Sequence, residues 1–261
     1  MTDRVSPARV FAAILLRDVT VARRELPYFL VRTTLQPLLF VIVFGFLLPR
    51  MGLIPRGYTT MMLPGIVALS LTMSAIQSVA LPMVQDFGWT KEIEDRLLAP
   101  IPTPLVAIEK IVAGVLQGIV AAIFVLPIAR LIMGAIPGLT FGNLPLLLLM
   151  TILSGAAFSS IGLYLGTAIA PQQIGLMFSV ILAPMIMFGC TYYPWIGLEH
   201  IPAMKYAVLI NPLVYVSEAM RAALTPSVPH MPSVVTLAAL VLISAVFLWL
   251  GLRAFDRRAI S

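Results

Sequence analysis

The residues that could carry chemistry gather in one short stretch of an otherwise apolar chain. Between Asp86 and Lys110 the sequence reads DFGWTKEIEDRLLAPIPTPLVAIEK, the most charged interior segment. Its ionisable residues have both signs and are Asp86, Lys91, Glu92, Glu94, Asp95, Arg96, Glu109 and Lys110. Charged side chains are costly to place in hydrocarbon. Residues 86–102 are therefore expected to form a water-exposed loop that another protein can contact.

Residues 90–98 of this loop can form two turns of helix. Charged residues at i, i+3 and i+4 spacing share one side, and apolar residues lie on another: Glu92, Asp95 and Arg96, against Ile93 and Leu97. Pro100 and the prolines after it stiffen the approach to the next apolar segment. A short rigid helix of this kind suits a groove on a partner. A solvated hairpin with incidental charge pairs is the alternative.

Other kinds of chemistry are not indicated. The sequence has no G-x-x-x-x-G-K-[ST] phosphate loop. No Asp, Glu or His pattern typical of ion-coupled carriers lies inside the long apolar runs; the polar side chains there are neutral, such as Gln36, Gln77 and Gln117. His200 and His230 alone do not make a metal site. The protein is therefore either a passive conductor or is driven by another protein, and the charged loop favours the second option.

The elements that hold this loop are predicted to be membrane helices. Of the 261 residues, 60% are hydrophobic and 11% are charged, whereas soluble domains carry roughly 25% charged residues. We therefore predict an all-α membrane protein with one transmembrane domain over residues 1–261. A span needs about 20 apolar residues, and six are predicted: 28–48, 59–85, 103–133, 143–169, 173–193 and 233–253.

An N-terminal helix over residues 5–26 is predicted to lie in the membrane interface. On a helical wheel one side is polar and basic, formed by Arg9, Arg17, Thr20, Arg23 and Arg24. Asp18 and Leu16 do not fit this pattern. The basic side would face anionic lipid headgroups and water. A plain cytoplasmic leader is the alternative.

The positive charges predict the orientation. Twelve of the seventeen Lys and Arg residues fall in the N-terminal segment, in the charged loop or in the C-terminal tail. Because Lys and Arg are enriched on the cytoplasmic side, both termini and the loop are predicted to lie in the cytoplasm. The net charge of +6 thus reflects a membrane face rather than binding to nucleic acid.

The segment 194–232 is predicted to lie outside, between the last two spans. It contains an apolar run too short to cross, AMKYAVLINPLVYV, in which Pro212 interrupts any helix. This run is expected to enter the outer leaflet and turn back, or to lie along it. Tyr192, Tyr193 and Trp195 are interpreted as an interfacial aromatic belt.

Small residues four apart let helix backbones approach closely. Such pairs are Gly114 and Gly118, Gly155 and Ser159, and Gly162 and Gly166. Packing within the chain is preferred here to a seam between two chains.

Three groups of residues resemble a known family. They are Leu63-Pro64-Gly65, then Glu92 to Pro100 followed by Pro104 and Lys110, and finally Pro194, Ile201-Pro202, Asn211-Pro212-Leu213, Glu218 and Arg221. In this order they resemble the permease subunits of type-2 ABC exporters, which move polysaccharides, lipids and drugs. Ile93-Glu94-Asp95-Arg96 departs from the Gly-Thr-Leu-Glu run of many members.

The resemblance implies how the protein would work. Two permease chains, identical or homologous, would pair in the plasma (inner) membrane, each contacting a cytoplasmic ABC ATPase that binds ATP and magnesium. This chain would hold no cofactor or metal and would not itself be an enzyme. The coupling helix would comprise Glu92, Ile93, Glu94, Asp95, Arg96, Leu97 and Pro100, and the re-entrant outer helices would carry Pro202, Asn211, Pro212, Glu218 and Arg221.

Glu218 and Arg221 are three residues apart and could form an ion pair on one helix. A structural clip is preferred to substrate binding for this pair. For the whole chain, the leading hypothesis is outward movement of an amphipathic or lipid-linked cargo. An ion-coupled or passive carrier, and a scaffold that recruits an ATPase without transport, are the alternatives.

Overall fold

The computed structural model describes residues 7–55, 57–88 and 102–260, and every regular element within these ranges is a helix. The long helices are α1 (Pro7–Arg24), α2 (Leu26–Phe40), α4 (Tyr58–Gly88), α6 (Thr103–Met133), α7 (Leu144–Ala168) and α12 (Ser233–Ile260). A π-helical turn, η1 (Val41–Leu47), and α3 (Leu48–Arg50) extend α2. The shorter elements are η2 (Pro171–Gln173), α8 (Ile174–Met177), η3 (Phe178–Leu182), α9 (Ala183–Met187), η4 (Trp195–His200), α10 (Pro202–Ala207), η5 (Val208–Ile210) and α11 (Pro212–Leu224).

Five helices within the described ranges are long and apolar enough to cross a membrane: Leu26–Arg50, Tyr58–Gly88, Thr103–Met133, Leu144–Ala168 and Ser233–Arg258. Each overlaps a predicted span, and their ends differ from the prediction by at most five residues. The prediction of an all-helical protein with several membrane spans is therefore confirmed.

The predicted span 173–193 is shorter in the structure. Here the apolar helical stretch is Pro171–Met187, and the chain leaves helical geometry at Phe188. Pro184 lies in the first turn of α9, a position where a helix tolerates the missing N–H, and α9 ends three residues later at Met187. Because a crossing needs about 20 residues, the count of six spans stays a prediction.

The interpretation of Tyr192 as part of an interfacial aromatic belt is wrong. Its side chain is only 9% exposed. The ring packs against Phe40 and Phe44, with centroid distances of 4.8 and 5.7 Å. Tyr192 therefore joins the segment after α9 to the first span instead of facing lipid headgroups.

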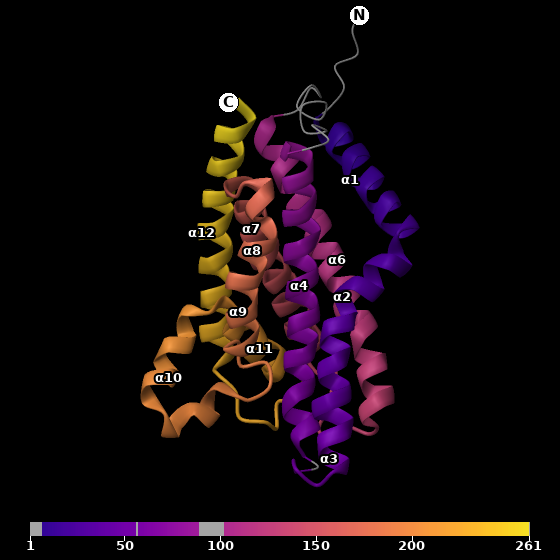
Figure 1. Cartoon of the computed structure of the whole chain (residues 1–261), viewed down its shortest axis with the longest axis vertical. Coiled ribbons are helices and arrows are strands. Elements are labelled where there is room, and N and C mark those ends of the chain that lie inside the picture. Colours follow the sequence, from indigo (N-terminus) through magenta and orange to yellow (C-terminus); the bar gives the residue numbers. More distant parts are fainter. Residues whose placement is uncertain (1–6, 56, 89–101, 261) are drawn as a thin grey trace, which may run out of the picture.

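Helix α4 is the centre of the bundle (Figure 1). It packs against α6, α7 and α11. Of its most apolar stretch 78% is buried, compared with 17% for α12. Helix α12 thus presents most of its apolar surface outward, as a lipid-facing span does.

The glycine pairs contribute to packing within the chain, as predicted. A Cβ at Gly162 would lie 2.7 Å from the Ile76 carbonyl oxygen, and one at Gly166 would lie 2.8 Å from that of Ala80. Gly118 similarly faces the Leu71 carbonyl. Helices α6 and α7 therefore approach the α4 backbone closely because these positions lack a side chain.

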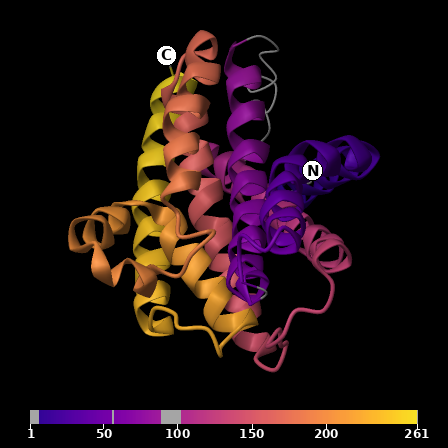
Figure 2. The ribbon, with the colours of Figure 1, turned by 60° about the horizontal axis from the view of Figure 1, so that its bottom comes forward.

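The outer segment forms a bent pair of helices. Residues Pro202–Ile210 and Pro212–Leu224 meet at 99°. Asn211 caps α11, since its side-chain oxygen accepts from the N–H of Leu213 at 3.0 Å, and Pro212 occupies the first turn. The predicted interruption at Pro212 is confirmed, whereas insertion of this pair into the membrane stays a prediction. In Figures 1 and 2, α10 projects from the bundle on the side away from α1.

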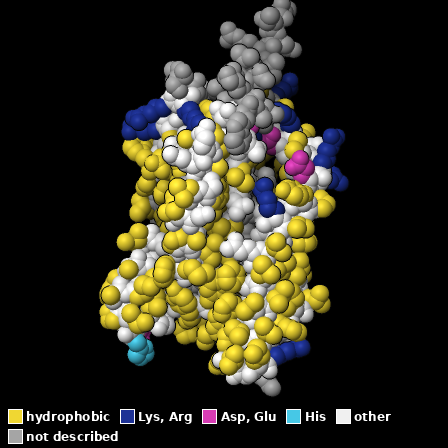
Figure 3. All heavy atoms as spheres, viewed as in Figure 1, with side chains coloured by type: hydrophobic (Ala, Val, Ile, Leu, Met, Phe, Trp, Pro, Cys, Tyr) yellow, Lys and Arg dark blue, Asp and Glu magenta, His cyan; other side chains and the backbone are white. Residues whose placement is uncertain are grey.

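The two ends of the bundle differ in charge. We call the end where α4 finishes and α6 begins the charged end. Figure 3 shows basic and acidic side chains gathered there, above a broad apolar band. Helix α1 and the last turns of α12 lie at the same end (Figure 1). The opposite end carries α3, and α10 and α11 lie toward it.

Candidate functional sites at the two ends of the bundle

Toward the opposite end, Glu218 and Arg221 form the ion pair that their spacing predicts. Both side chains are fully buried, and Arg221 Nη1 donates to Glu218 Oε1. Glu218 also accepts from the backbone N–H groups of Trp195 at 2.9 Å and of Met231 at 2.8 Å. One carboxylate therefore holds the segments on either side of α10 and α11.

Arg221 extends this cluster to α4 and to the segment between α9 and η4. Its Nη2 donates to the carbonyl oxygens of Cys190 at 3.0 Å, Met61 at 3.3 Å and Tyr193 at 3.4 Å. A buried charge needs such partners because its hydration is lost. The hydrogen bonds of this pair thus connect α11 to α4 and to the segments that precede α10 and follow α11.

At the charged end, Asp18 and Lys110 connect α1 to α6. Lys110 Nζ lies 2.6 Å from Asp18 Oδ2, and the side chains are 6% and 13% exposed. Asp18 was the acidic residue that did not fit the basic stripe of the N-terminal helix. The structure gives the reason: Asp18 faces the bundle rather than water, and anchors α1 beside the start of α6.

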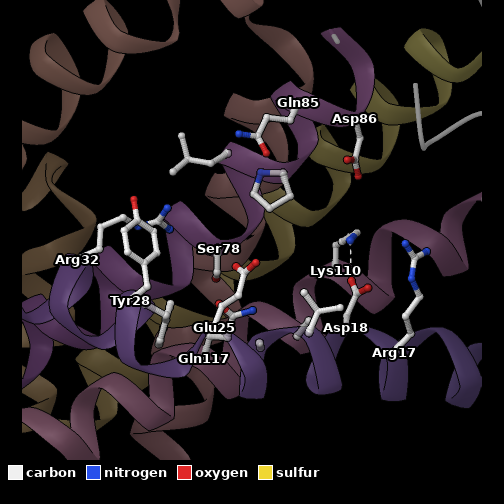
Figure 4. Close-up of a pocket in the computed structure, with 16 residues that line it drawn as sticks. Arg17, Asp18, Glu25, Tyr28, Arg32, Ser78, Gln85, Asp86, Lys110 and Gln117 are labelled. Atoms are coloured by element: carbon white, nitrogen blue, oxygen red, sulfur yellow. Dashed lines mark hydrogen bonds and ion pairs between the residues drawn. The ribbon is translucent and has the colours of Figure 1, made fainter. Parts of the chain in front are cut away.

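A polar cavity of about 520 Å³ lies next to this ion pair. Its walls come from α1, from the junction of α1 with α2, and from α4 and α6. Figure 4 shows its polar side chains, and these are Arg17, Asp18, Glu25, Tyr28, Arg32, Ser78, Gln85, Asp86, Lys110 and Gln117. Three of them are basic and three are acidic, so their formal charges cancel. Such a lining can bind a group that carries both signs.

The predicted site residues fall in three places. Glu92, Ile93, Glu94, Asp95, Arg96, Leu97 and Pro100 lie outside the described residues. Arg9, Arg17, Arg23 and Arg24 are exposed on α1. Pro202 begins α10, and Asn211, Pro212, Glu218 and Arg221 belong to α11 or its cap. The structure thus brings Arg17 to the cavity and joins Glu218 to Arg221.

Sequence reasoning did not identify Glu25, Tyr28 or Ser78 as site residues. Glu25 stands at the junction of α1 and α2, where only the fold shows which way it points (Figure 4). The available signal was an acidic residue directly before a proline-containing first turn, at the end of a basic helix. Within the described residues, no group of three or more His, Cys, Asp or Glu side chains could hold a metal ion.

A bundle of long apolar helices, with a charged loop end and an amphipathic N-terminal helix, defines a multi-pass membrane protein. The family model described as "ABC-2 type transporter" matches residues 9–225. The chain therefore belongs to the ABC-2 type transporter family. The match spans both the charged loop and most of the outer segment.

Named relatives agree with this membership. The chain is 27% identical over 222 residues to the inner membrane transport permease YadH of Escherichia coli strain K12, covering 80% of both chains. The same values relate it to the YadH proteins of Escherichia coli O157:H7 and of Shigella flexneri. The chain is thus a membrane transport permease, and its family implies an ABC ATPase partner.

Proposed function

We propose that this chain is the membrane subunit of an ATP-driven exporter in the inner membrane. The family match over residues 9–225 carries the proposal, because it covers the chain from α1 through α11 and leaves only α12 beyond it. The name of the relatives, inner membrane transport permease, supports the location. A separate ABC ATPase would bind ATP and magnesium, and a second permease chain, identical or homologous, would complete the pathway.

The charged end would face the cytoplasm and receive the ATPase. Basic side chains there support this orientation, since Lys and Arg favour the cytoplasmic side. Residues 92–100 would form the coupling helix that the ATPase pushes. Movement would pass to α1 and α6, because the Asp18–Lys110 ion pair joins these helices next to the loop.

The cargo would be amphipathic or lipid-linked and would move outward. An apolar body with few ionisable groups supports this class, since a strongly hydrated solute would need polar groups along its path. The bent pair of α10 and α11 would close the outer end, and the Glu218–Arg221 clip would hold that closure in shape.

The coupling helix is tested by reversing its charge. Glu92→Lys combined with Asp95→Lys should reduce co-purification with the ATPase and reduce cargo-stimulated ATP hydrolysis by tenfold or more, since two attractive contacts become repulsive, each worth about 1 kcal/mol or more. Glu199→Lys is the matched control, because Glu199 is exposed toward the opposite end. Unchanged assembly and hydrolysis in the double variant would contradict the coupling role.

Transport itself is tested by reconstitution. Vesicles with the permease and its ATPase should accumulate a fluorescent amphiphile against its gradient when ATP is supplied. Uphill accumulation by the purified chain alone would instead identify an ion-coupled carrier. ATPase recruitment without any ATP-dependent movement of amphiphiles would identify a scaffold.

A further inference from the structure

The polar cavity at the charged end has the size and position of a lipid headgroup site. Its volume of about 520 Å³ falls within the usual range for small-molecule sites, roughly 300–1,000 Å³. It lies beside α1 and the start of α2, where the charged end meets the apolar body. Figure 3 shows a hollow on this face, flanked by basic and acidic side chains.

One part of the cavity is rich in hydrogen-bond acceptors. Glu25, Ser78 and Gln117 come from three different elements and lie together in the view of Figure 4. The Ser78 hydroxyl donates to the Ala75 carbonyl oxygen at 3.1 Å, which leaves its own oxygen able to accept. A carboxylate, a hydroxyl oxygen and an amide oxygen together match the three N–H donors of a primary ammonium group.

Glu25 is available to a ligand. Its side chain is exposed and makes no hydrogen bond or ion pair with the described residues. The nearby cation Lys110 is held by Asp18 at 2.6 Å. An ammonium group on a ligand could therefore act as the positively charged partner of the Glu25 carboxylate.

A basic residue lies within reach of the same ligand. Arg32 follows Glu25 by seven residues, about 10 Å along the helix axis, and also lines the cavity. Like that of Glu25, the side chain of Arg32 is exposed and makes no hydrogen bond or ion pair within the described part of the chain. The length of an arginine side chain covers much of that separation, and guanidinium groups bind phosphate oxygens in pairs.

The balance of charge selects the class of ligand. A purely anionic group would be repelled by Glu25, and a purely cationic group would be repelled by Arg32. We propose that the cavity binds the headgroup of an ethanolamine phospholipid from the membrane leaflet at the charged end. Glu25, Ser78 and Gln117 accept from its primary ammonium, and Arg32 binds its phosphodiester.

This site does not depend on export or on an ATPase, so it is tested on the purified full chain. Binding of phospholipids with identical acyl chains and ethanolamine, choline or glycerol headgroups is measured by native mass spectrometry in detergent. The ethanolamine lipid should bind about tenfold more tightly than the choline lipid, since choline has no N–H donors and a charged hydrogen bond is worth about 1.5 kcal/mol.

Variants separate the two halves of the headgroup. Glu25→Gln should abolish the preference for ethanolamine over choline, and Glu199→Gln, far from the cavity, should retain it. Arg32→Gln should weaken the ethanolamine and glycerol lipids alike by about tenfold. Arg50→Gln is its control, because Arg50 stacks on Phe46 at 3.9 Å at the opposite end.

Three results would overturn the proposal. These are equal binding of the ethanolamine and choline lipids, persistence of the preference in folded Glu25→Gln, and binding of soluble glycerophosphoethanolamine without binding of the lipid. The last result would identify a site for a free metabolite. Ser78→Ala, which removes one acceptor and no charge, provides a milder variant and should reduce the preference by a smaller factor.

Discussion

Two ion pairs in the described part of the chain, Glu218–Arg221 and Glu199–Lys205, differ in burial, so the loss of each has a different consequence. Glu218 and Arg221 are both fully buried, and each also bonds backbone groups of other segments. Lys205 and Glu199 lie 3.6 Å apart with Glu199 59% exposed. Breaking a buried pair leaves a charge without water or partner, whereas breaking an exposed one does not.

The first prediction concerns Glu218→Gln. Loss of its charge leaves Arg221 buried without a counter-ion, so the free energy of unfolding should fall by about 3–5 kcal/mol. Thermal unfolding of the detergent-solubilised protein measures this change. Glu199→Gln should shift stability by about 1 kcal/mol or less. Equal effects of the two variants would show that the buried cluster does not hold the outer segment.

At the scale of elements, helix contacts in this bundle depend on positions without a side chain. Among the described glycines, Gly65 in the first turns of α4 makes the closest contact, because a Cβ there would lie 1.8 Å from the Thr191 carbonyl oxygen. That contact joins α4 to the segment between α9 and η4. The close packing against Thr191 therefore explains why the Leu63-Pro64-Gly65 motif ends in glycine.

The second prediction follows from this contact. Gly65→Ala should destabilise the protein by about 1–3 kcal/mol, because two backbones must separate to admit one methyl group. Thermal unfolding again measures the change. Gly175→Ala is the helical control, since nothing lies within 4 Å of a Cβ at Gly175, and it should leave stability unchanged or slightly raised.

The third prediction concerns the attachment of α1. Asp18→Asn removes the charge that binds Lys110, so α1 should separate from α6 more often. Hydrogen exchange of backbone amides in residues 7–24 should become faster, while amides of α4 and α7 should be unaffected. Asp256→Asn, at the same end on α12, is the control. Unchanged exchange in Asp18→Asn would show that apolar contacts alone hold α1.

For the whole molecule, the distribution of charge predicts its direction in the membrane. The charged end carries α1 and the end of α12, and Figure 3 shows the apolar band beside it. The native Cys190 is buried, so a single introduced cysteine can report on its own position. This makes topology directly measurable.

The fourth prediction is the outcome of that measurement. In intact cells a membrane-impermeant maleimide should label Glu199→Cys, and should label Ser261→Cys only after permeabilisation. Positive-inside bias is the physical reason. The reverse pattern would place the charged end outside and would exclude residues 92–100 as the contact for a cytoplasmic ATPase.

The sequence alone determined the long helices and the pairing of Glu218 with Arg221. Apolar runs of about 20 residues have few alternatives to a spanning helix, since backbone groups in lipid must bond within the helix. The spacing of three residues likewise set the Glu218–Arg221 pair, because i and i+3 share one face. These features depend on local geometry, which the sequence contains.

Only the tertiary structure decided the rest. Asp18 did not fit the basic stripe until its partner Lys110, 92 positions later, was seen beside it. Tyr192 was assigned to the interface because its type suits that place, but contacts with Phe40 bury it. Glu25, Arg32 and Gln117 line one cavity only because α1, α2 and α6 meet there. Contacts between distant segments depend on how helices pack, and helical periodicity carries no information on which helices meet.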